Sequence, residues 1–196
     1  MVNEISKIYN EEFFESVTKG EFLCSFDMAK IILEILKPKS IIDIGCGNGI
    51  HLNAFKECGI TDYVGYDGSE VALKKSLLPK GEIILHDLRK PLSLNRKYDL
   101  CCCIEVAEHI EERYAKTLIN TLVGLSDLIL FTAAVPKQGG TNHVNEQPHE
   151  YWKNLFKQKG YFYCDYTSEK LRRLFWVVNI NDWIYNNLMV FRKGEI

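Results

Sequence analysis

The sequence lacks the features that mark several classes of protein. It has no apolar run of about eighteen residues, the length that a membrane-spanning helix needs, so no membrane association is expected. It begins MVNEISKIYNEEFF, which is acidic and polar where a signal peptide is basic and then apolar, and we expect a cytoplasmic protein. Repeats, low-complexity tracts and linkers are also missing, which predicts a single domain over residues 1–196.

The chain also has little net charge and no cysteine motif. Its 24 basic and 26 acidic residues are interspersed, without the basic stripe of a nucleic-acid-binding protein, so no nucleic-acid partner is predicted. The seven cysteines form no C-x-x-C pair and no spacing typical of zinc sites. Three of them, Cys101–Cys103, are consecutive in an apolar run and are expected to be small buried hydrophobic residues of a reduced protein.

What is present is an alternation of short apolar runs with helical segments. Helices are predicted at 4–18, at 25–37 with Ser25 as N-cap, and at 50–58, 70–77, 110–122 and 149–159. Strands are predicted at 40–44, 63–66, 82–86, 98–104, 128–135, 161–166 and 188–192. This order predicts an α/β fold, a doubly wound Rossmann-like sheet that is mostly parallel with a C-terminal antiparallel strand. Such sheets bind ligands beyond the carboxyl ends of their strands.

A glycine-rich stretch follows the first predicted strand. Residues 41–50 read IIDIGCGNGI, and the alternating glycines open a predicted helix, as in loops that bind nucleotides. The spacing departs from the G-x-G-x-x-G of dinucleotide-binding loops, because Ile50 stands where those loops need a small residue. Asp43 would repel a pyrophosphate and would favour a cationic group such as an α-ammonium. Both observations favour S-adenosylmethionine, which has an adenosine and an amino acid but no phosphate.

Acidic motifs follow the next three strands in order. Asp67 stands in VGYDGS, Asp87 in LHDL, and residues 105–109 read EVAEH. Together with the glycine loop, these motifs resemble the class I SAM-dependent methyltransferases over residues 25–135, a family with the class I methyltransferase fold. The EVAEH segment is similar to the E-V-x-E-H of small-molecule methyltransferases. The resemblance implies an enzyme that uses S-adenosylmethionine and releases S-adenosylhomocysteine.

The resemblance also implies roles for individual residues. Asp67 would accept hydrogen bonds from the ribose hydroxyls, and Asp87 would contact the adenine amino group. Structural roles fit as well: Asp67 as a helix cap, Asp87 in a turn, and His109 packed at a helix start. The predicted cofactor contacts are Asp43, Gly45, Cys46, Gly47, Asn48, Gly49, Asp67, Gly68, Ser69, His86, Asp87, Leu88, Glu105, Val106 and His109.

A polar loop after the fifth strand carries candidate catalytic side chains. Residues 137–150 read KQGGTNHVNEQPHE, and polar loops at the ligand edge of a sheet are often functional. Methyl transfer is an in-line displacement, and a hydroxyl acceptor must also lose a proton to a base. We predict His143 as that base or as a substrate anchor, with Glu146 as its orienter or substitute. Alternatively, Asn145, Glu146 and Gln147 only tie the loop in place.

The acceptor is predicted to be a small polar metabolite that is methylated on oxygen or nitrogen. The HVNEQP segment and the Tyr151–Trp152 pair look like those of methyltransferases encoded among bacterial surface-carbohydrate genes. This favours a sugar-, nucleotide- or phosphoryl-linked precursor of capsule polysaccharide. The acceptor pocket is expected from residues 1–24, as a lid or an ordinary packing helix, and from insertions at 137–187. The predicted acceptor contacts are Tyr9, Phe13, His109, Asn142 and Asn145.

Two other functions fit parts of this pattern. A SAM-binding regulator or subunit without catalysis would keep the pocket but would not need the two histidines of the polar loop. A NAD-dependent oxidoreductase is disfavoured by Ile50 and Asp43. The paired Asp and Asn ligands of catechol-type methyltransferases are not evident, so no metal is predicted. The expected assembly is a monomer or homodimer with a small-molecule substrate.

Overall fold

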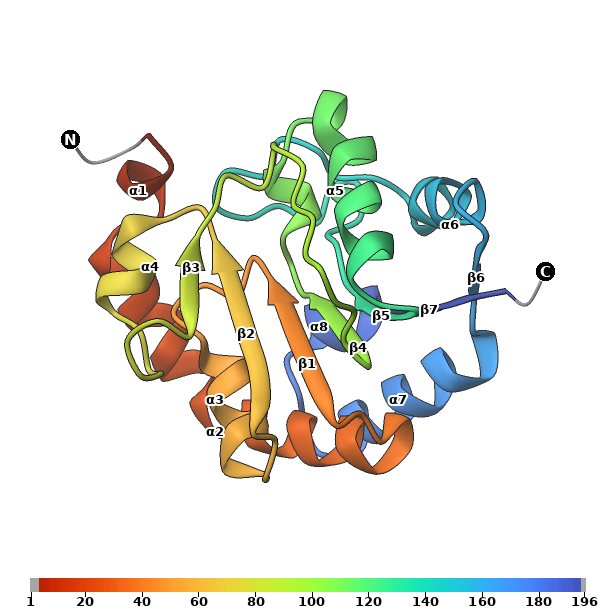
Figure 1. Ribbon diagram of the computed structural model, residues 1–196, viewed down its shortest axis with the longest axis horizontal. Coiled ribbons are helices and arrows are strands. Elements are labelled where there is room, and N and C mark those ends of the chain that lie inside the picture. Colours follow the sequence, from red (N-terminus) through yellow and green to blue (C-terminus); the bar gives the residue numbers. More distant parts are fainter. Residues whose placement is uncertain (1–3, 195–196) are drawn as a thin grey trace.

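The computed structural model describes residues 4–194 and contains a seven-stranded sheet with helices on both faces (Figure 1). The strands lie in the order β3-β2-β1-β4-β5-β7-β6, and β7 runs in the opposite direction to the other six, antiparallel to both β5 and β6. The predicted mostly parallel α/β sheet with an antiparallel C-terminal strand is confirmed. The elements are α1 (Glu4–Ile8), α2 (Glu11–Leu36), β1 (Ser40–Ile44), α3 (Ile50–Glu57), β2 (Asp62–Asp67), α4 (Glu70–Lys74), β3 (Ile83–Leu85), β4 (Leu100–Cys103), the 3-10 turn η1 (Ala107–His109), α5 (Glu112–Leu125), β5 (Leu128–Phe131), α6 (His149–Lys157), β6 (Tyr161–Tyr163), α7 (Asp165–Val177), α8 (Asp182–Asn187) and β7 (Met189–Lys193).

Two hydrophobic layers cover the two faces of the sheet, and the three consecutive cysteines of β4 contribute side chains to both layers. Cys102 packs in the layer that includes α2, α3, α7 and α8, whereas Cys101 and Cys103 pack in the layer with α5 and α6. This is the alternation that a strand imposes on successive side chains. All three are fully buried free thiols, and burial raises their pKa well above the usual value. They are buried hydrophobic residues, as predicted.

The N-terminal helices are divided differently from the prediction. Helix α2 is continuous over 26 residues, and Ser25, predicted to cap a second helix, is buried within it. The cap is Asn10, whose side chain accepts a hydrogen bond from the N–H of Phe13 at 3.0 Å. A glycine inside a helix, here Gly20, costs about 1 kcal/mol. That cost is too small to end a helix whose next turns pack Met28 into the core.

The C-terminal part also differs from the prediction. The strand expected at 161–166 ends at Tyr163, and the segment beyond it, for which no helix is predicted, forms α7 and α8. Leu171, Phe175 and Ile184 from these helices are buried in the same layer as α2. Long-range packing has therefore decided the structure of this polar-looking stretch.

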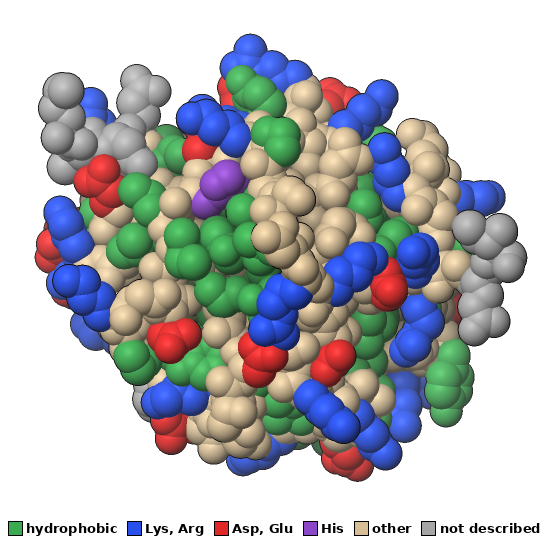
Figure 2. Space-filling model, in the orientation of Figure 1, with side chains coloured by type: hydrophobic (Ala, Val, Ile, Leu, Met, Phe, Trp, Pro, Cys, Tyr) green, Lys and Arg blue, Asp and Glu red, His purple; other side chains and the backbone are tan. Residues whose placement is uncertain are grey.

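The surface agrees with the charge balance of the sequence. On the face shown in Figure 2, acidic and basic side chains are interspersed rather than gathered by sign. Over residues 4–194, no helix has both the length and the apolar composition needed to cross a bilayer.

Candidate functional site

The loop between β1 and α3 brings backbone N–H groups to the carboxyl edge of the sheet. Gly45, Gly47 and Gly49 all have positive φ, from 55° to 82°. Gly45 has to be glycine, because a Cβ there would lie 2.7 Å from Cγ1 of Val106 and closer still to Cγ2. The N–H of Gly45 donates to the Tyr66 carbonyl at 2.7 Å and so ties the loop to the end of β2.

Asp67, the last residue of β2, joins two of the loops at this edge. Its Oδ2 accepts a hydrogen bond from the N–H of Gly47, and its Oδ1 accepts one from the N–H of Ser69, each at 2.8 Å. Burial raises the pKa of Asp67, and these backbone hydrogen bonds oppose the increase. The cap of α4 is Ser69, not Asp67. Each carboxylate oxygen keeps capacity for a further donor.

Asp43, predicted to contact the cofactor, lies inside the sheet rather than at its carboxyl edge. It sits within β1, paired in register with Gly65 and Cys102, and is 2% exposed. Burial, and after it the charge of Asp67, raises the pKa of Asp43 to about 7. Asp43 is not among the residues that line the adjoining pocket. It could therefore affect a bound cation through the electric field of its charge but not by direct contact.

The loop after β3 places an ion pair beside the pocket. The carboxylate of Asp87 accepts two hydrogen bonds from the Arg89 guanidinium, at 2.8 and 3.0 Å, which lower the pKa of Asp87. Asp87 also accepts the N–H of Arg89, so it does stabilise the turn. His86 points elsewhere, with Nε2 at 3.2 Å from the Lys90 carbonyl and its ring edge-on to Tyr66.

The segment after β4 carries two buried carboxyl groups. Glu105 has a φ of 51°, an uncommon backbone conformation for a residue other than glycine, and its carboxylate accepts hydrogen bonds from the Asn187 amide. Glu108 is fully buried, and among the described residues its carboxylate oxygens face the Glu105 carboxyl group and the backbone N–H groups of Glu108 and Ala134 without a well-formed hydrogen bond. Burial, followed by the charge of Glu105, raises the pKa of Glu108 to about 9.

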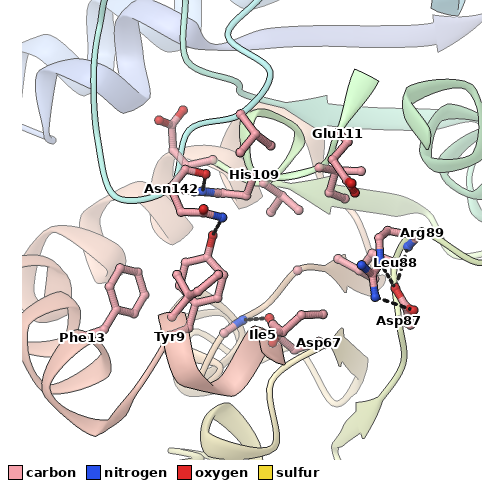
Figure 3. Close-up of a pocket in the computed structure, with 18 of the residues that line it drawn as sticks. Ile5, Tyr9, Phe13, Asp67, Asp87, Leu88, Arg89, His109, Glu111 and Asn142 are labelled. Carbon is pink, nitrogen blue, oxygen red and sulfur yellow. Dashed lines mark hydrogen bonds and ion pairs between the residues drawn. The ribbon is translucent and has the colours of Figure 1, made fainter. Parts of the chain in front are cut away.

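His109 faces the pocket at the end of η1. Its Nδ1 lies 3.4 Å from the Asn142 carbonyl, and its ring packs edge-on against Tyr9 with the ring centroids 5.4 Å apart. Burial and the nearby His143 lower the pKa of His109 to about 4, so the ring is neutral at physiological pH. Asn142 lies between Tyr9 and His109 (Figure 3), and its amide donates to the Tyr9 hydroxyl at 3.5 Å.

The polar loop docks on the EVAEH segment. The N–H groups of Val144 and Asn145 both donate to the Glu108 carbonyl, at 2.9 and 3.0 Å. His143 Nδ1 lies 3.0 Å from Oε1 of Glu146, and the His143 ring packs on His109 with the centroids 4.9 Å apart. The predicted pairing of His143 with Glu146 is thus present in the geometry.

Glu146 is held in place by the backbone of its own loop. Its carboxylate accepts the N–H groups of Lys137 and Gly139, each at 2.7 Å. The side chain of Gln147 donates to Asn145, which in turn reaches the Ala107 carbonyl. The alternative that these residues tie the loop therefore also describes contacts that are present.

A pocket of about 380 Å³ lies above the carboxyl ends of the strands, within the ~300–1,000 Å³ typical of ligand sites (Figure 3). Its N-terminal wall comes from α1 and the start of α2. The predicted site residues that line it are Tyr9, Phe13, Gly45, Gly47, Asp67, Gly68, Asp87, Leu88, Glu105, Val106, His109 and Asn142. The predicted residues not among its lining are Asp43, Cys46, Asn48, Gly49, Ser69, His86, His143, Asn145 and Glu146.

Several residues of the wall are not predicted from the sequence. Ile5, Ile8, Phe14, Arg89, Ile110, Glu111 and Val144 also line the pocket. Two of these could have been found from the sequence. Phe14 belongs to the aromatic N-terminal segment, and Arg89 is a cation two residues after Asp87. From residues 137–187, only Asn142 and Val144 reach the pocket, because α7 and α8 are committed to the core.

A family model described as a methyltransferase domain matches residues 24–181. No curated protein matches the sequence. Among solved structures, a sugar N-methyltransferase from Streptoalloteichus is similar with a TM-score of 0.70 at 13% identity, over 95% of this chain and 93% of that chain.

Two further structures share the fold. An amino pentose methyltransferase of calicheamicin biosynthesis from Micromonospora echinaspora has a TM-score of 0.67 at 14% identity, over 92% of this chain and 96% of that chain. A plantazolicin methyltransferase, solved with SAH, has a TM-score of 0.67 at 17% identity, over 97% of this chain and 94% of that chain. At these identities the likeness concerns the fold.

Proposed function

The chain belongs to the methyltransferase domain family, and from this premise we propose that its pocket binds S-adenosylmethionine and delivers the methyl group to a small polar acceptor. The protein is thus an enzyme of the transferase class, and the family match gives no support to an oxidoreductase or a non-catalytic regulator. The observation that carries the proposed cofactor is Asp67, a pocket-lining carboxylate held by two backbone N–H groups with capacity for further donors.

The cofactor is proposed to lie along the carboxyl ends of β1, β2 and β4. Its ribose hydroxyls donate to Asp67, and its adenine lies between Leu88 and Val106 with its amino group toward Asp87. Its amino-acid end lies over Gly45 and Gly47, where the absence of side chains leaves room. The acidic groups along this wall favour a ligand with a cationic sulfonium and ammonium over one with phosphates.

The acceptor is proposed to bind on the side of Tyr9, Phe13, His109 and Asn142. There its lone pair attacks the methyl carbon in line with sulfur, the carbon–sulfur bond breaks, and the bonding electrons remain on sulfur as a neutral thioether. Holding the two reactants in this geometry can supply much of the rate enhancement. Ile5 of α1 and Phe13 and Phe14 of α2 line the pocket, and these apolar side chains would limit the access of water to the reacting groups.

The proton of the acceptor is proposed to leave by way of the two histidines. His109 contacts the acceptor, and His143, held by Glu146, packs against His109 and is not among the residues that line the pocket. Glu146 is therefore a positioning residue in this proposal. The weakly basic His109, with its pKa near 4, is suited to accepting a hydrogen bond rather than to holding a proton.

The proposed acceptor class is a sugar or sugar-linked precursor, methylated on oxygen or nitrogen. The HVNEQP segment, similar to surface-carbohydrate methyltransferases, supports a role in capsule polysaccharide synthesis. A sugar N-methyltransferase and an amino pentose methyltransferase with the same fold add support for sugars, and a plantazolicin methyltransferase with that fold acts on a different kind of acceptor.

Thermal unfolding with S-adenosylhomocysteine, and separately with NAD, tests the cofactor. A ligand at about 100 times its Kd adds ~2.7 kcal/mol to the free energy of unfolding. Stabilisation by S-adenosylhomocysteine is expected, and stabilisation by NAD alone would overturn the proposal. Transfer of labelled methyl from S-adenosylmethionine to a panel of nucleotide sugars, amino sugars and sugar phosphates then tests the acceptor class. Transfer to none of the panel would reject the sugar-linked assignment.

A further inference from the structure

Three potential metal ligands converge at the rim of the pocket. Glu108, His109 and His143 each offer one donor atom, and these atoms lie within 4.8 Å of one another. Two of them are neighbours on η1, and the third comes from the polar loop, much further along the chain. Only the docking of that loop brings the group together.

The carboxylate of Glu108 gives a second, independent indication that this cluster binds a ligand. The side chain is 0% exposed, and among residues 4–194 neither carboxylate oxygen makes a well-formed hydrogen bond. Its polar neighbours are the Glu105 carboxyl group and the backbone N–H groups of Glu108 and Ala134. A buried, unpaired carboxyl group costs several kcal/mol in general, so proteins pair such groups or use them to coordinate metals. Glu105 adds a second carboxyl group close by. Glu105 already accepts hydrogen bonds from Asn187, so Glu108 is the carboxyl group that a cation would satisfy.

Both histidines are held with one nitrogen engaged. Nδ1 of His143 pairs with Glu146 at 3.0 Å, and Nδ1 of His109 faces the Asn142 carbonyl at 3.4 Å. Metal-binding histidines typically donate one ring N–H to a carboxylate or a backbone carbonyl, which orients the other nitrogen toward the ion. On this pattern Nε2 of each ring is the ligand atom.

The surrounding backbone supports the arrangement. Glu146 is itself fixed by two backbone N–H groups, and the loop is fastened to the Glu108 carbonyl by Val144 and Asn145. Gly140 provides the room for the His143 ring, because a Cβ at that position would collide with Nε2 and Cε1 of the ring. These contacts position the donors from outside the cluster.

We propose that Glu108, His109 and His143 bind one divalent transition-metal ion such as Mn²⁺, Fe²⁺, Co²⁺ or Zn²⁺. Two imidazoles with one carboxylate form a donor set that suits these ions rather than Mg²⁺ or Ca²⁺. Bonds of about 2.0–2.2 Å allow donor separations of up to about 4.3 Å, so closing the site requires only small side-chain movements. The inference departs from the sequence-based expectation of no metal.

The consequence for methyl transfer rests on the proposed function, although metal binding itself does not. Of the three ligands, His109 lines the pocket and Glu108 and His143 do not, so an acceptor hydroxyl would reach the ion from the side of His109. Coordination lowers the pKa of a bound hydroxyl, which then loses its proton to water more easily. The resulting oxygen anion attacks the methyl carbon, and the carbon–sulfur electron pair stays on sulfur. With the ion bound, His109 and His143 would act as ligands rather than as the route for the proton.

Cobalt binding provides a test that does not depend on activity. Chelator-treated protein is titrated with Co²⁺ and followed by visible absorption, with isothermal titration of Mn²⁺ in parallel. We expect one saturable site per chain with the absorption bands of protein-bound Co²⁺. Glu108→Gln and His143→Ala should each weaken binding by at least about 100-fold, and Glu146→Gln by about 10- to 100-fold.

Matched controls separate a metal site from a buried neutral acid. Glu111→Gln and His86→Ala remove the same chemical groups nearby without touching the cluster, and should leave cobalt affinity unchanged. Glu108→Gln keeps the volume of the side chain, and its thermal unfolding without metal establishes that it is folded. Lack of saturable binding at millimolar Co²⁺ would overturn the proposal, as would full affinity in Glu108→Gln. Binding of S-adenosylhomocysteine by the same samples reports on the proposed function separately.

Discussion

Replacing Asp67 by asparagine tests the assignment of the cofactor to this pocket most directly. The substitution keeps the size of the side chain but removes its charge. Two backbone N–H groups, from Gly47 and Ser69, point at the carboxylate oxygens at 2.8 Å. A side-chain amide offers one acceptor oxygen where the carboxylate offers two, so one of these N–H groups loses its partner in the variant.

The size of the effect on affinity follows from the number of hydrogen bonds at stake. A hydrogen bond to a charged group contributes about 1.5–3 kcal/mol, and in the proposed complex the ribose hydroxyls donate to this carboxylate. Loss of one such bond weakens S-adenosylhomocysteine binding by about 10- to 150-fold. Isothermal titration calorimetry measures the Kd, and thermal unfolding of the ligand-free variant shows how far the fold is affected.

Asp99→Asn is a matched control at the other end of the sheet. Oδ2 of Asp99 also accepts two backbone N–H groups, from Lys39 at 2.8 Å and Ser40 at 3.1 Å, but at the start of β1. It should lower stability without changing affinity for S-adenosylhomocysteine. A change of less than about threefold (~0.7 kcal/mol) in the Kd of Asp67→Asn would refute the assignment. An equal loss of affinity in Asp99→Asn would show that the effect is structural.

Three further predictions address the loop, the histidine and the pH dependence. Gly45→Ala should lower the free energy of unfolding, measured by urea titration, by about 2–5 kcal/mol, because the residue has a positive φ and its new Cβ would collide with Val106. The control Gly20→Ala, in open space inside α2, should instead raise the free energy of unfolding by about 0.4–1 kcal/mol. Equal effects of the two substitutions would contradict the steric argument. His143→Ala should leave the Kd for S-adenosylhomocysteine unchanged while turnover falls by about 10²- to 10⁴-fold; unchanged turnover would exclude His143 from the acceptor side. Burial lowers the pKa of His51 to about 4. As the pH falls below about 6.5 this histidine takes up a proton in the unfolded chain but not in the folded one, so this group lowers the free energy of unfolding by about 2 kcal/mol at pH 5. Urea unfolding at pH 7 and pH 5 should show a smaller decrease for His51→Gln than for the unchanged protein, and an equal decrease would be inconsistent with a neutral buried His51.

Much of the fold and of the cofactor wall was predictable because the signals are local. Unalternated apolar runs such as Ile41–Ile44 mark strands buried on both faces, and parallel strands bring their carboxyl ends to one edge. The glycine loop, Asp67 and Asp87 each follow such a strand, so their meeting requires only the sheet. Gly20 and Ser25 led to a wrong helix boundary because their preferences are also local and are weak. Packing of α2 against α3 and α7 outweighs them.

The sequence by itself determined the order of the strands, the glycine loop after β1, and the acidic residues that follow β2, β3 and β4. Only the tertiary structure decided which of these side chains face the pocket. It buried Asp43 in the sheet, set His143 against His109 rather than in the pocket wall, and buried Glu108 beside Glu105. The burial of Asp43 depends on the two strands that flank β1, and the histidine contact depends on a loop that docks far from its own position in the sequence. Local patterns carry no record of such contacts.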